Sequence, residues 1–246
     1  MKLERELFIS DLHYPNEFNL KAFNLILDYV KKMKIDYLVI GGDLVDFKSV
    51  SNWLTPLEER SLEFELNEVL DFVNFLSDRF KRSTKIYIEG NHEERLTKYL
   101  HSRAPELDSL KILEIDNLLR LSDKSIKYVK NKDNRFIGKL TFNINGLYHL
   151  HGHEVKISSN VINPAKIMFE RLGRSVIFGH HHRSSEWIYR NIEDSYFQSV
   201  SVGSVSNLNP DYSAYNNWNN GFAIIEYYSD NSFKIFNKKI INNNIV

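Results

Sequence analysis

Gly41-Gly42-Asp43-Leu44-Val45-Asp46 is the stretch on which the fold prediction depends. It follows Ile35 to Ile40, a short, mostly apolar and β-prone run that predicts a buried strand of a parallel sheet. The two glycines allow a sharp turn, so we expect Asp43 to project from the carboxyl edge of that strand. Ligands bind at this edge in open α/β sheets. Because turns are often acidic, Asp43 becomes informative only together with the residues that end the other strands.

A second strand end lies near the N-terminus. Glu6 to Ser10 predicts a short strand, which is followed at once by Asp11-Leu12-His13. A carboxylate and an imidazole two residues apart point the same way on extended backbone, which suits a pair of metal ligands. A helix is predicted from Phe18 to Lys34, with Leu20, Phe23, Leu27 and Val30 on its apolar face. This helix would return the chain to the Asp43 strand as a βαβ crossover.

The third strand end has the most specific sequence. Thr84 to Glu89 predicts a strand, and Gly90-Asn91-His92-Glu93-Glu94 then opens a helix that runs to about Arg103. Asn91 stands where an N-cap is expected, and acidic residues suit the first turn of a helix. Capping does not explain why three successive strand ends present Asp/His, Asp/Asp and Asn/His. Their recurrence predicts one polar site at the edge of the sheet.

The second half of the chain is mostly strands. An amphipathic helix from about Leu57 to Phe80 precedes the third strand, after a loop from Phe47 to Pro56. Later strands are predicted at 125–130, 140–144, 147–150, 175–178, 197–202, 221–228 and 232–236, with a helix at 164–172. Early βαβ units followed by mainly antiparallel strands indicate an α/β fold in which two sheets pack face to face with helices outside.

Histidines cluster after two of these strands. The runs His149-Leu150-His151-Gly152-His153 and Gly179-His180-His181-His182 hold six of the nine histidines in the chain. Clustering behind glycine-marked strand ends favours metal binding over isolated structural histidines. His180 and His182 repeat the spacing of Asp11 and His13.

Composition limits the remaining classes. The chain has 246 residues, 42% hydrophobic and 26% charged, which is ordinary for a globular protein. Lys+Arg and Asp+Glu both number 32, so no overall basicity indicates a nucleic-acid binder. There is no cysteine, which leaves His, Asp, Glu or Asn as metal ligands. No signal core or membrane span is evident, so we expect a single cytoplasmic domain over 1–246, with a long helical insertion at about 47–83 and no separate cap domain.

Five short motifs occur in a fixed order: D-x-H at Asp11, G-D-x-x-D at Asp43, G-N-H-E at Gly90, H-G-H at His151 and G-H-x-H at His180. Each is weak alone, but together they closely resemble the calcineurin-like metallophosphoesterase superfamily, over residues 6 to about 205. The resemblance implies a four-layer α/β/β/α sandwich of two mixed sheets flanked by helices, with the site on the loops at the strand ends.

The resemblance also implies roles for individual residues. One divalent metal would be held by Asp11, His13, Asp43 and His182, and a second by Asp43, Asn91, His151 and His180. Asp43 would bridge the two ions, whose repulsion a shared anion offsets. A hydroxide between the ions is the implied nucleophile, and His92, oriented by Asp46, is the implied general acid. Manganese is the first expectation for the metal, with iron, zinc or nickel as alternatives.

Departures from the superfamily concern the substrate. Protein phosphatases of this group carry D-x-H-G and G-D-x-x-D-R-G, whereas here Tyr14 follows His13 and Phe47 follows Asp46. The arginine that binds phosphate in those enzymes is therefore missing from the position after Asp46. The sequence looks more like phosphodiesterases and nucleases, such as small stand-alone members from phage and bacteria. We expect a phosphate-ester substrate, with nucleic acid or nucleotide as the first candidate and no membrane partner.

Two other functions remain open from the sequence, namely a phosphomonoesterase or protein phosphatase on the same site and a non-catalytic scaffold. Arg95, Arg183 and Lys48 are candidates for contacting phosphate, although each is more often a structural charge. The histidines His101, His149, His153 and His181 are assigned to the surroundings of the site or to the surface. Aromatic residues of the asparagine-rich tail (Tyr212, Tyr215 and Trp218) suit packing better than a platform for a base.

Overall fold

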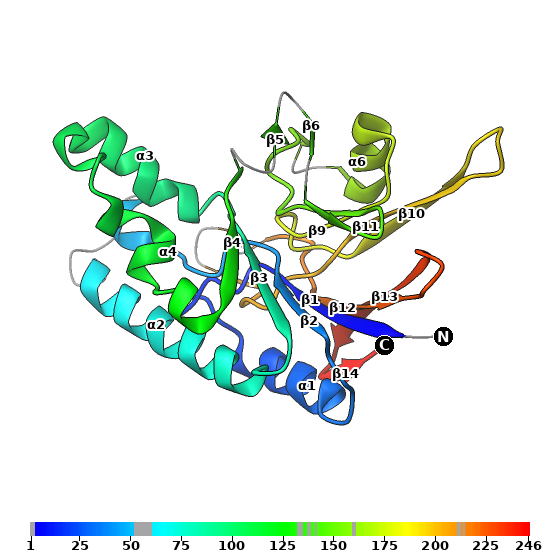
Figure 1. The fold of residues 1–246 in the computed structure, drawn as a ribbon, viewed down its shortest axis with the longest axis horizontal. Helices are drawn as coiled ribbons and strands as arrows, with labels where there is room; N and C mark the ends of the chain where they lie inside the picture. The colour runs from blue at the N-terminus through cyan, green and yellow to red at the C-terminus, as the bar shows by residue number, and fades with distance from the viewer. Residues whose placement is uncertain are drawn as a thin grey trace.

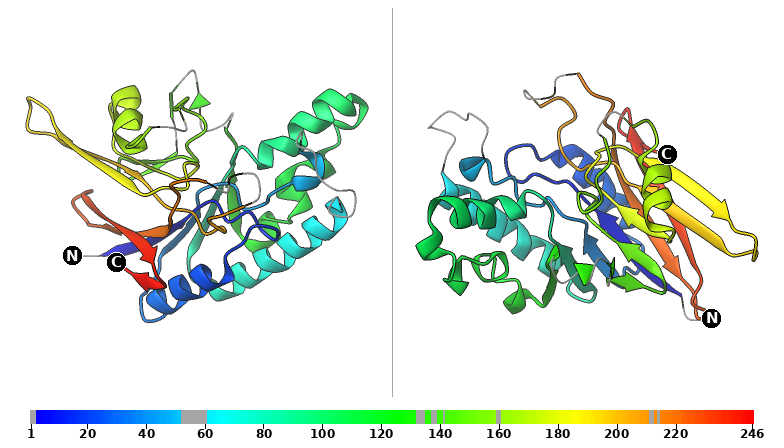
Figure 2. Two further views of the ribbon diagram at one scale, coloured as in Figure 1. Left: turned by 180° about the vertical axis from the view of Figure 1, so that it is seen from behind. Right: turned by 90° about the horizontal axis from the view of Figure 1, so that it is seen from above.

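The chain forms two β-sheets that face each other, with helices on both outer sides (Figure 1). The computed structural model describes residues 3–51, 61–131, 135–136, 139–140, 142–158, 161–210, 213 and 215–246. Views from behind and from above show the same layering, and in all of them one hairpin extends beyond the body of the molecule (Figure 2). The predicted α/β/β/α sandwich is confirmed.

The larger sheet has seven strands in the order β14-β13-β12-β1-β2-β3-β4. Its first four strands in sequence run parallel, and β12 joins β1 antiparallel. The bounds are β1 Glu4–Ile9, β2 Tyr37–Ile40, β3 Thr84–Ile88, β4 Ile126–Val129, β12 Asn220–Tyr227, β13 Phe233–Ile241 and β14 Asn244–Ile245. The parallel arrangement brings the carboxyl ends of β1, β2 and β3 to one edge, as the turn sequences predict.

The smaller sheet has five strands in the order β10-β11-β9-β8-β7. Strands β8, β9 and β11 are parallel, while β7 and β10 pair antiparallel at the two edges. The bounds are β7 Asn143–Ile144, β8 Leu147–His149, β9 Val176–Phe178, β10 Ser185–Arg190 and β11 Tyr196–Ser201; β5 Arg135–Phe136 and β6 Lys139–Leu140 form a separate pair. The two histidine runs therefore follow neighbouring parallel strands.

Helices cover the outer face of each sheet. Helices α1 and α2 lie along the larger sheet, and α6 lies over the smaller one (Figure 1). The α-helices are α1 Leu20–Val30, α2 Leu62–Arg79, α3 Glu93–Arg103, α4 Ile115–Leu118 and α6 Pro164–Leu172, and the 3₁₀ turns are η1 Lys48–Val50, η3 Pro105–Leu107, η4 Lys111–Leu113 and η5 Ser122–Lys124. No helix within these described segments is long and apolar enough to cross a membrane.

The central strands are apolar throughout because successive side chains point to opposite faces of the sheet and both faces are covered. In β1, Leu7 and Ile9 pack against the helices, while Phe8 between them faces the second sheet. The same division places Leu38 with the helices and Val39 between the sheets. Strands covered on both faces lack a polar side, which is typical of parallel sheets. The layers thus hold the strand ends in fixed positions beneath the site.

A buried polar contact also joins the two sheets. His149 Nε2 of β8 lies 3.0 Å from both carboxylate oxygens of Glu6 in β1. Tyr227 of β12 donates its hydroxyl proton to Glu6 Oε2 at 2.7 Å. Glu6 and His149 are fully buried, so this histidine lies in the core rather than at the surface or around the site. A charge buried there is tolerated only because it is paired and hydrogen-bonded.

Several expected boundaries differ from the observed ones. Helix α1 is shorter than predicted, begins after the Asn19 cap, and leaves Leu20 61% exposed. Its buried face is formed by Ala22, Phe23, Ile26 and Val30, so the helix is rotated from the expected stripe.

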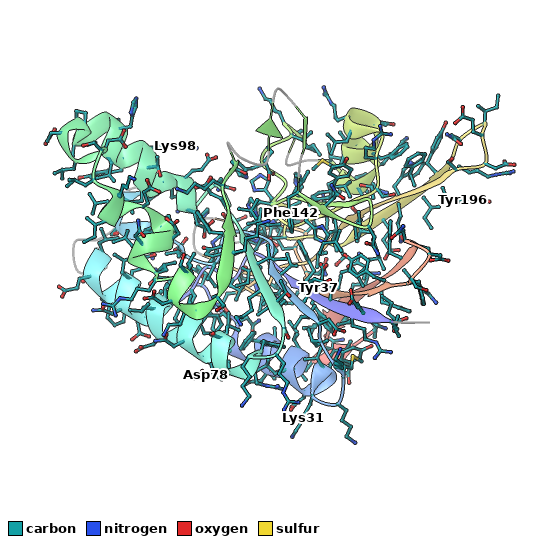
Figure 3. The ribbon with its side chains drawn as sticks, in the orientation of Figure 1. Lys31, Tyr37, Asp78, Lys98, Phe142 and Tyr196 are labelled. Carbon is teal, nitrogen blue, oxygen red and sulfur yellow. The ribbon has the colours of Figure 1, made fainter. Side chains whose placement is uncertain are left out.

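Strand β10 was not predicted, because this edge strand is largely exposed and lacks a buried alternation. In Figure 3, Tyr196 lies near the outer end of the β10–β11 hairpin, whereas Phe142 lies near the centre of the view.

Helix α2 supports the loop that follows Asp46. Its Glu65 is buried and accepts hydrogen bonds from the Lys48 backbone N–H at 3.3 Å and the Ser49 hydroxyl at 3.4 Å. The loop includes Phe47, which is fully buried with a left-handed φ of 49°. Burial, together with the Asp46 carboxylate, raises the pKa of Glu65 from 4.5 to about 7.

This raised pKa predicts a pH-dependent stability. Stabilisation by protonated Glu65 is complete below about pH 4.5 and is lost as pH rises through about 7. Replacing Glu65 with Gln keeps a neutral group, so we expect the free energy of unfolding of Glu65→Gln to fall less over this window. The difference from wild type should be at most about 3 kcal/mol. Urea unfolding of the metal-free protein at several pH values measures it.

Glu63→Gln provides the matched control, because Glu63 is an exposed carboxylate in the same helix. We expect the pH profile of this variant to match wild type. A profile of Glu65→Gln that also matches wild type would contradict the pKa assigned to Glu65.

Candidate active site

The site forms where loops from the two sheets meet. The turn after β1 pairs with the turn after β2, because Leu12 and His13 both donate their backbone N–H to the Asp43 carbonyl, at 2.9 and 3.0 Å. Loops of the second sheet are tied to these turns by side chains. His151 Nδ1 lies 2.8 Å from the Gly41 carbonyl, and the His180 backbone N–H donates to Asp11 Oδ2 at 2.9 Å. The ends of β1, β2, β8 and β9 therefore converge on one place.

A first group of ligand atoms comes from Asp11, His13 and His182, all buried. The Nε2 atoms of His13 and His182 face each other at 3.1 Å, and Asp11 Oδ1 lies 3.2 Å from His182 Nε2. Bonds of about 2.0–2.2 Å from a cation to nitrogen or oxygen place neighbouring ligand atoms about 3 Å apart. These spacings suit one divalent ion.

A second group comes from Asp43, His151 and His180, whose ligand atoms lie within 4.8 Å of one another. Asp43 Oδ2 is 3.2 Å from His151 Nε2, and Asn91 Oδ1 is 3.1 Å from that same nitrogen. Asn91 was expected at the N-cap of α3, but the N-cap is His92 and the Asn91 amide points to His151. The structure thus brings Asn91 to this second group.

Asp43 lies between the two groups. Its Oδ2 is 4.0 Å from His13 Nε2 on one side and 3.2 Å from His151 Nε2 on the other. Its Oδ1 is directed away from this gap and accepts the His92 backbone N–H at 2.9 Å. The carboxylate is therefore held with one oxygen available to both groups, which is the placement that a shared ligand requires.

His92 and Asp46 form a pair beside the first group. His92 Nδ1 lies 3.0 Å from Asp46 Oδ1 and 2.9 Å from the Asp46 carbonyl. The Arg95 guanidinium reaches His92 Nε2 at 2.7 Å and the Asp46 carbonyl at 2.8 Å. An arginine can only donate, so Nε2 is the accepting nitrogen and His92 is neutral in this arrangement. Burial lowers the pKa of His92 although Asp43 raises it.

The backbone of the site is strained. Asp11, His13, Asp43, His180 and His182 all have left-handed φ values, from 48° to 64°. Non-glycine residues rarely adopt this region, and each costs about 1–2 kcal/mol. Such residues persist where surrounding contacts fix them, and they concentrate at functional sites.

A buried lone pair and a shifted histidine support a cation in this site. Asp11 Oδ1 is buried, faces His182 Nε2 and has no hydrogen-bond partner within the described part of the chain. Burial lowers the pKa of His151, yet the Asp43 carboxylate raises it well above the usual range. A carboxylate that stabilises a proton on a neighbouring imidazole would equally stabilise a metal cation bound to that imidazole instead of the proton. The residues present therefore fit the divalent metals that the sequence implies.

The candidate phosphate contacts have other partners. Arg183 is buried and its guanidinium donates to the Val161 carbonyl. The Lys48 backbone N–H donates to Glu65. Arg95 is held by His92 and the Asp46 carbonyl. Of the two arginines, Arg95 is therefore the one whose guanidinium lies against the site.

The remaining histidines take different places. His101 is exposed on α3, and His153 contacts Glu94 at 3.2 Å and lies next to His151, with ring centroids 5.2 Å apart. The ring centroid of His181 lies 5.1 Å from that of His180. Burial lowers the pKa of His181 to about 4. Part of the loop from Phe47 to Pro56, and Tyr212 of the tail, fall outside the described segments.

Two residues beside the site were not assigned to it from sequence. Trp218 packs its ring against the His182 ring, with centroids 4.3 Å apart, although the sequence suggested only general packing in the tail. Glu93 is fully buried and hydrogen-bonds the Asp43 turn, although an acidic residue there is explained by the helix N-terminus alone. The Gly-Asn-His-Glu spacing was the available signal for Glu93.

Comparisons with known proteins identify the family of this chain. A model of the family described as calcineurin-like phosphoesterase matches residues 5–212. The gene 54 proteins of Mycobacterium phages L5 and D29 are each 26% identical to this chain, over 238 and 235 residues. In both cases the match covers 90% of this chain and 88% of the phage protein.

Solved structures show a looser likeness. Vps29 from Chaetomium thermophilum superposes with a TM-score of 0.44 and 13% identity, covering 99% of this chain and 91% of that one. Nuclease MPE from Pseudomonas putida gives a TM-score of 0.40 and 11% identity, covering 89% and 83%. Scores this low are too weak to assign a function.

Metal binding should stabilise the folded protein. With Mn²⁺ at about 100 times its dissociation constant, the free energy of unfolding should rise by about 2.7 kcal/mol, or roughly 5–10 °C in melting temperature. Thermal unfolding with Mn²⁺ and after addition of chelator measures this shift. Asp11→Asn should lose most of it, because Asp11 belongs to the first ligand group.

His101→Gln is the control, since His101 is exposed and outside the ligand groups. We expect it to keep the full shift. Equal shifts in Asp11→Asn and His101→Gln would show that the ion binds elsewhere.

Proposed function

This chain belongs to the calcineurin-like phosphoesterase family, and we propose that it is a dinuclear phosphodiesterase acting on nucleotides or nucleic acid. The family is divalent-metal-dependent, and its members are phosphoric ester hydrolases. The chain is accordingly a metal-dependent phosphoric ester hydrolase with His and Asp groups able to bind metal. The number of ions, the diester preference and the substrate class are our proposal.

The position of Asp43 Oδ2 is the observation that supports two ions. Asp11, His13, Asp43 and His182 would hold one, and Asp43, Asn91, His151 and His180 the other. When bound, divalent cations acidify the attacking water and offset charge on the phosphate oxygens. The ligand set contains only nitrogen and oxygen, which suits manganese and leaves iron, zinc and nickel as alternatives.

His92 is the residue that we propose as proton donor. Its Nε2 lies 3.7 Å from Asp43 Oδ2, next to the shared oxygen. Nε2 accepts from Arg95 in the neutral form, so the donor role requires that His92 takes up a proton and that Arg95 releases Nε2. As water attacks phosphorus and the bond to the leaving oxygen breaks, that oxygen would take the Nε2 proton, and a proton lost by the attacking water would replace it. Asp46 fixes the ring through Nδ1. Because burial lowers the pKa of His92, its protonated form gives up the proton readily.

The preference for diesters is supported by the residue after Asp46. Protein phosphatases of the superfamily place an arginine there, whereas Phe47 here is fully buried and supplies no cation. A monoester dianion has one negative charge more than a diester and gains more from such an arginine. Nucleic acids are linked by phosphodiesters throughout, and cyclic nucleotides also contain one, which is why we propose this class.

His92→Ala tests the acid. We expect turnover of a nucleotide diester, whose alkoxide leaving group is poor, to fall by at least about 10²-fold, the usual scale for a lost general acid. The loss should be smaller for bis-p-nitrophenyl phosphate, because p-nitrophenolate leaves without a proton. Steady-state rates on both substrates, with metal content measured by elemental analysis, give the comparison.

Metal content should stay at the wild-type value in His92→Ala, since His92 is not a proposed ligand. Equal losses on the two diesters would remove His92 from the role of acid. His101→Gln again serves as the histidine control.

A paired assay tests the substrate class. With Mn²⁺, we expect bis-p-nitrophenyl phosphate to be hydrolysed faster than p-nitrophenyl phosphate, and chelator to abolish both activities. Single- and double-stranded DNA and RNA would be tried next. A preference for the monoester would favour a phosphatase instead, and no turnover with both ions bound would favour a scaffold.

A further inference from the structure

We propose that Glu93 is a positioning residue for the metal centre, which holds the Asp43 turn so that one Asp43 oxygen faces both ligand groups. The proposal rests on the proposed function in one respect, namely that Asp43 is the shared ligand. It assigns Glu93 no contact with metal or substrate. Its effect would be exerted wholly through the backbone of the Asp43 turn.

The Glu93 carboxylate accepts four hydrogen bonds. Oε2 accepts from the backbone N–H of Asp43 at 3.0 Å and of Gly90 at 2.7 Å. Oε1 accepts from the Val45 N–H at 3.1 Å and from the Tyr87 hydroxyl at 2.5 Å. Every partner is a donor, so the carboxylate acts only as an acceptor. Two of the four bonds fix alternate amides of the Asp43–Val45 turn.

These bonds act where the backbone most needs support. Asp43 has a φ of 49°, a conformation that a non-glycine residue keeps only when neighbours impose it. The Glu93 bond to the Asp43 N–H fixes one side of this residue. The bond from the His92 N–H to Asp43 Oδ1 fixes its side chain. Oδ2 is then directed toward the gap between the ligand groups.

Gly90 lies directly against the Asp43 turn. A Cβ added to Gly90 would lie 2.2 Å from Asp43 Oδ1, 2.4 Å from the Asp43 N and 2.7 Å from Glu93 Oε2. Gly90 therefore permits the β3 loop to approach the Asp43 turn closely enough for Glu93 to reach it. The Gly-Asn-His-Glu sequence thus supplies the space, a ligand, the acid and the positioning carboxylate in succession.

An ordinary helix N-terminus does not account for Glu93. Its neighbour Glu94 pairs with Lys98 one turn along the helix and also contacts His153, so its bonds are directed away from the Asp43 turn. Glu93 is fully buried, and three of its four bonds reach outside its own turn, to Asp43, Val45 and Tyr87. Burying a carboxylate is costly, and these donors explain how the site tolerates it.

The test is metal binding to the metal-free protein, measured by calorimetric titration with Mn²⁺. Glu93→Gln keeps the side-chain volume but replaces one carboxylate oxygen with an amide NH₂ group. This group cannot accept hydrogen bonds from the donors that face it. Loss of a partner that orients a metal ligand typically costs 10–100-fold in metal affinity. We expect a loss of this size in Glu93→Gln and a larger one in Glu93→Ala. Circular dichroism of the metal-free variants reports whether they remain folded.

Two controls separate positioning from general stability. Tyr87→Phe removes a bond to the same carboxylate but none to the Asp43 turn, and Glu94→Gln changes the adjacent carboxylate. Both should bind Mn²⁺ within about threefold of wild type, well short of the loss expected for Glu93→Gln. If Glu93→Ala does not fold, Glu93→Gln decides the question.

Wild-type affinity and stoichiometry in folded Glu93→Gln would overturn the proposal, even if its melting temperature fell. Failure of wild type itself to bind two Mn²⁺ ions would count instead against the proposed function. Asp43→Ala is the reference for losing the shared ligand, and its loss should be at least as large as that of Glu93→Gln.

Discussion

The structure depends on holding like-charged groups together in a buried site. Asp11, Asp43, Asp46 and Glu93 are buried carboxylates that converge at one end of the two sheets. Such groups repel one another and lose hydration, so their positions must be imposed by the backbone. The bonds of Leu12 and His13 to the Asp43 carbonyl do this between adjacent turns. The strained φ values of the ligands are the local cost of that arrangement.

Rigidity in the layers below makes this arrangement possible. Loops of the larger sheet supply Asp11, His13, Asp43 and Asn91. Loops of the smaller sheet supply His151, His180 and His182, so a shift between the sheets would separate the ligands. The apolar residues between the sheets resist such a shift. The buried contact between Glu6 and His149 adds a directional restraint close to the strand ends that precede Asp11 and His151. The positions of the ligand residues therefore depend on the packing between the two sheets.

The sequence predicts the parts of this site that depend on hydrophobic period and on turn residues. Parallel strands end at a common edge, so apolar runs followed by Asp43 or His180 already indicate one site. Contacts across the chain are harder to predict. Glu93 resembles any acidic residue at a helix start, and only the folded loops reveal that its acceptors meet the Asp43 turn. Strand β10 was not predicted either, because the sequence of an exposed edge strand need not alternate between apolar and polar residues.

Charge balance links the buried carboxylates to the metals. Asp11, Asp43 and Asp46 bring negative charge to the buried site, and bound divalent cations would offset it. Without cations, the carboxylates draw protons onto the imidazoles instead, and for this reason the pKa values of His13 and His151 are raised despite burial. Protons and metal ions thus compete for the same nitrogens.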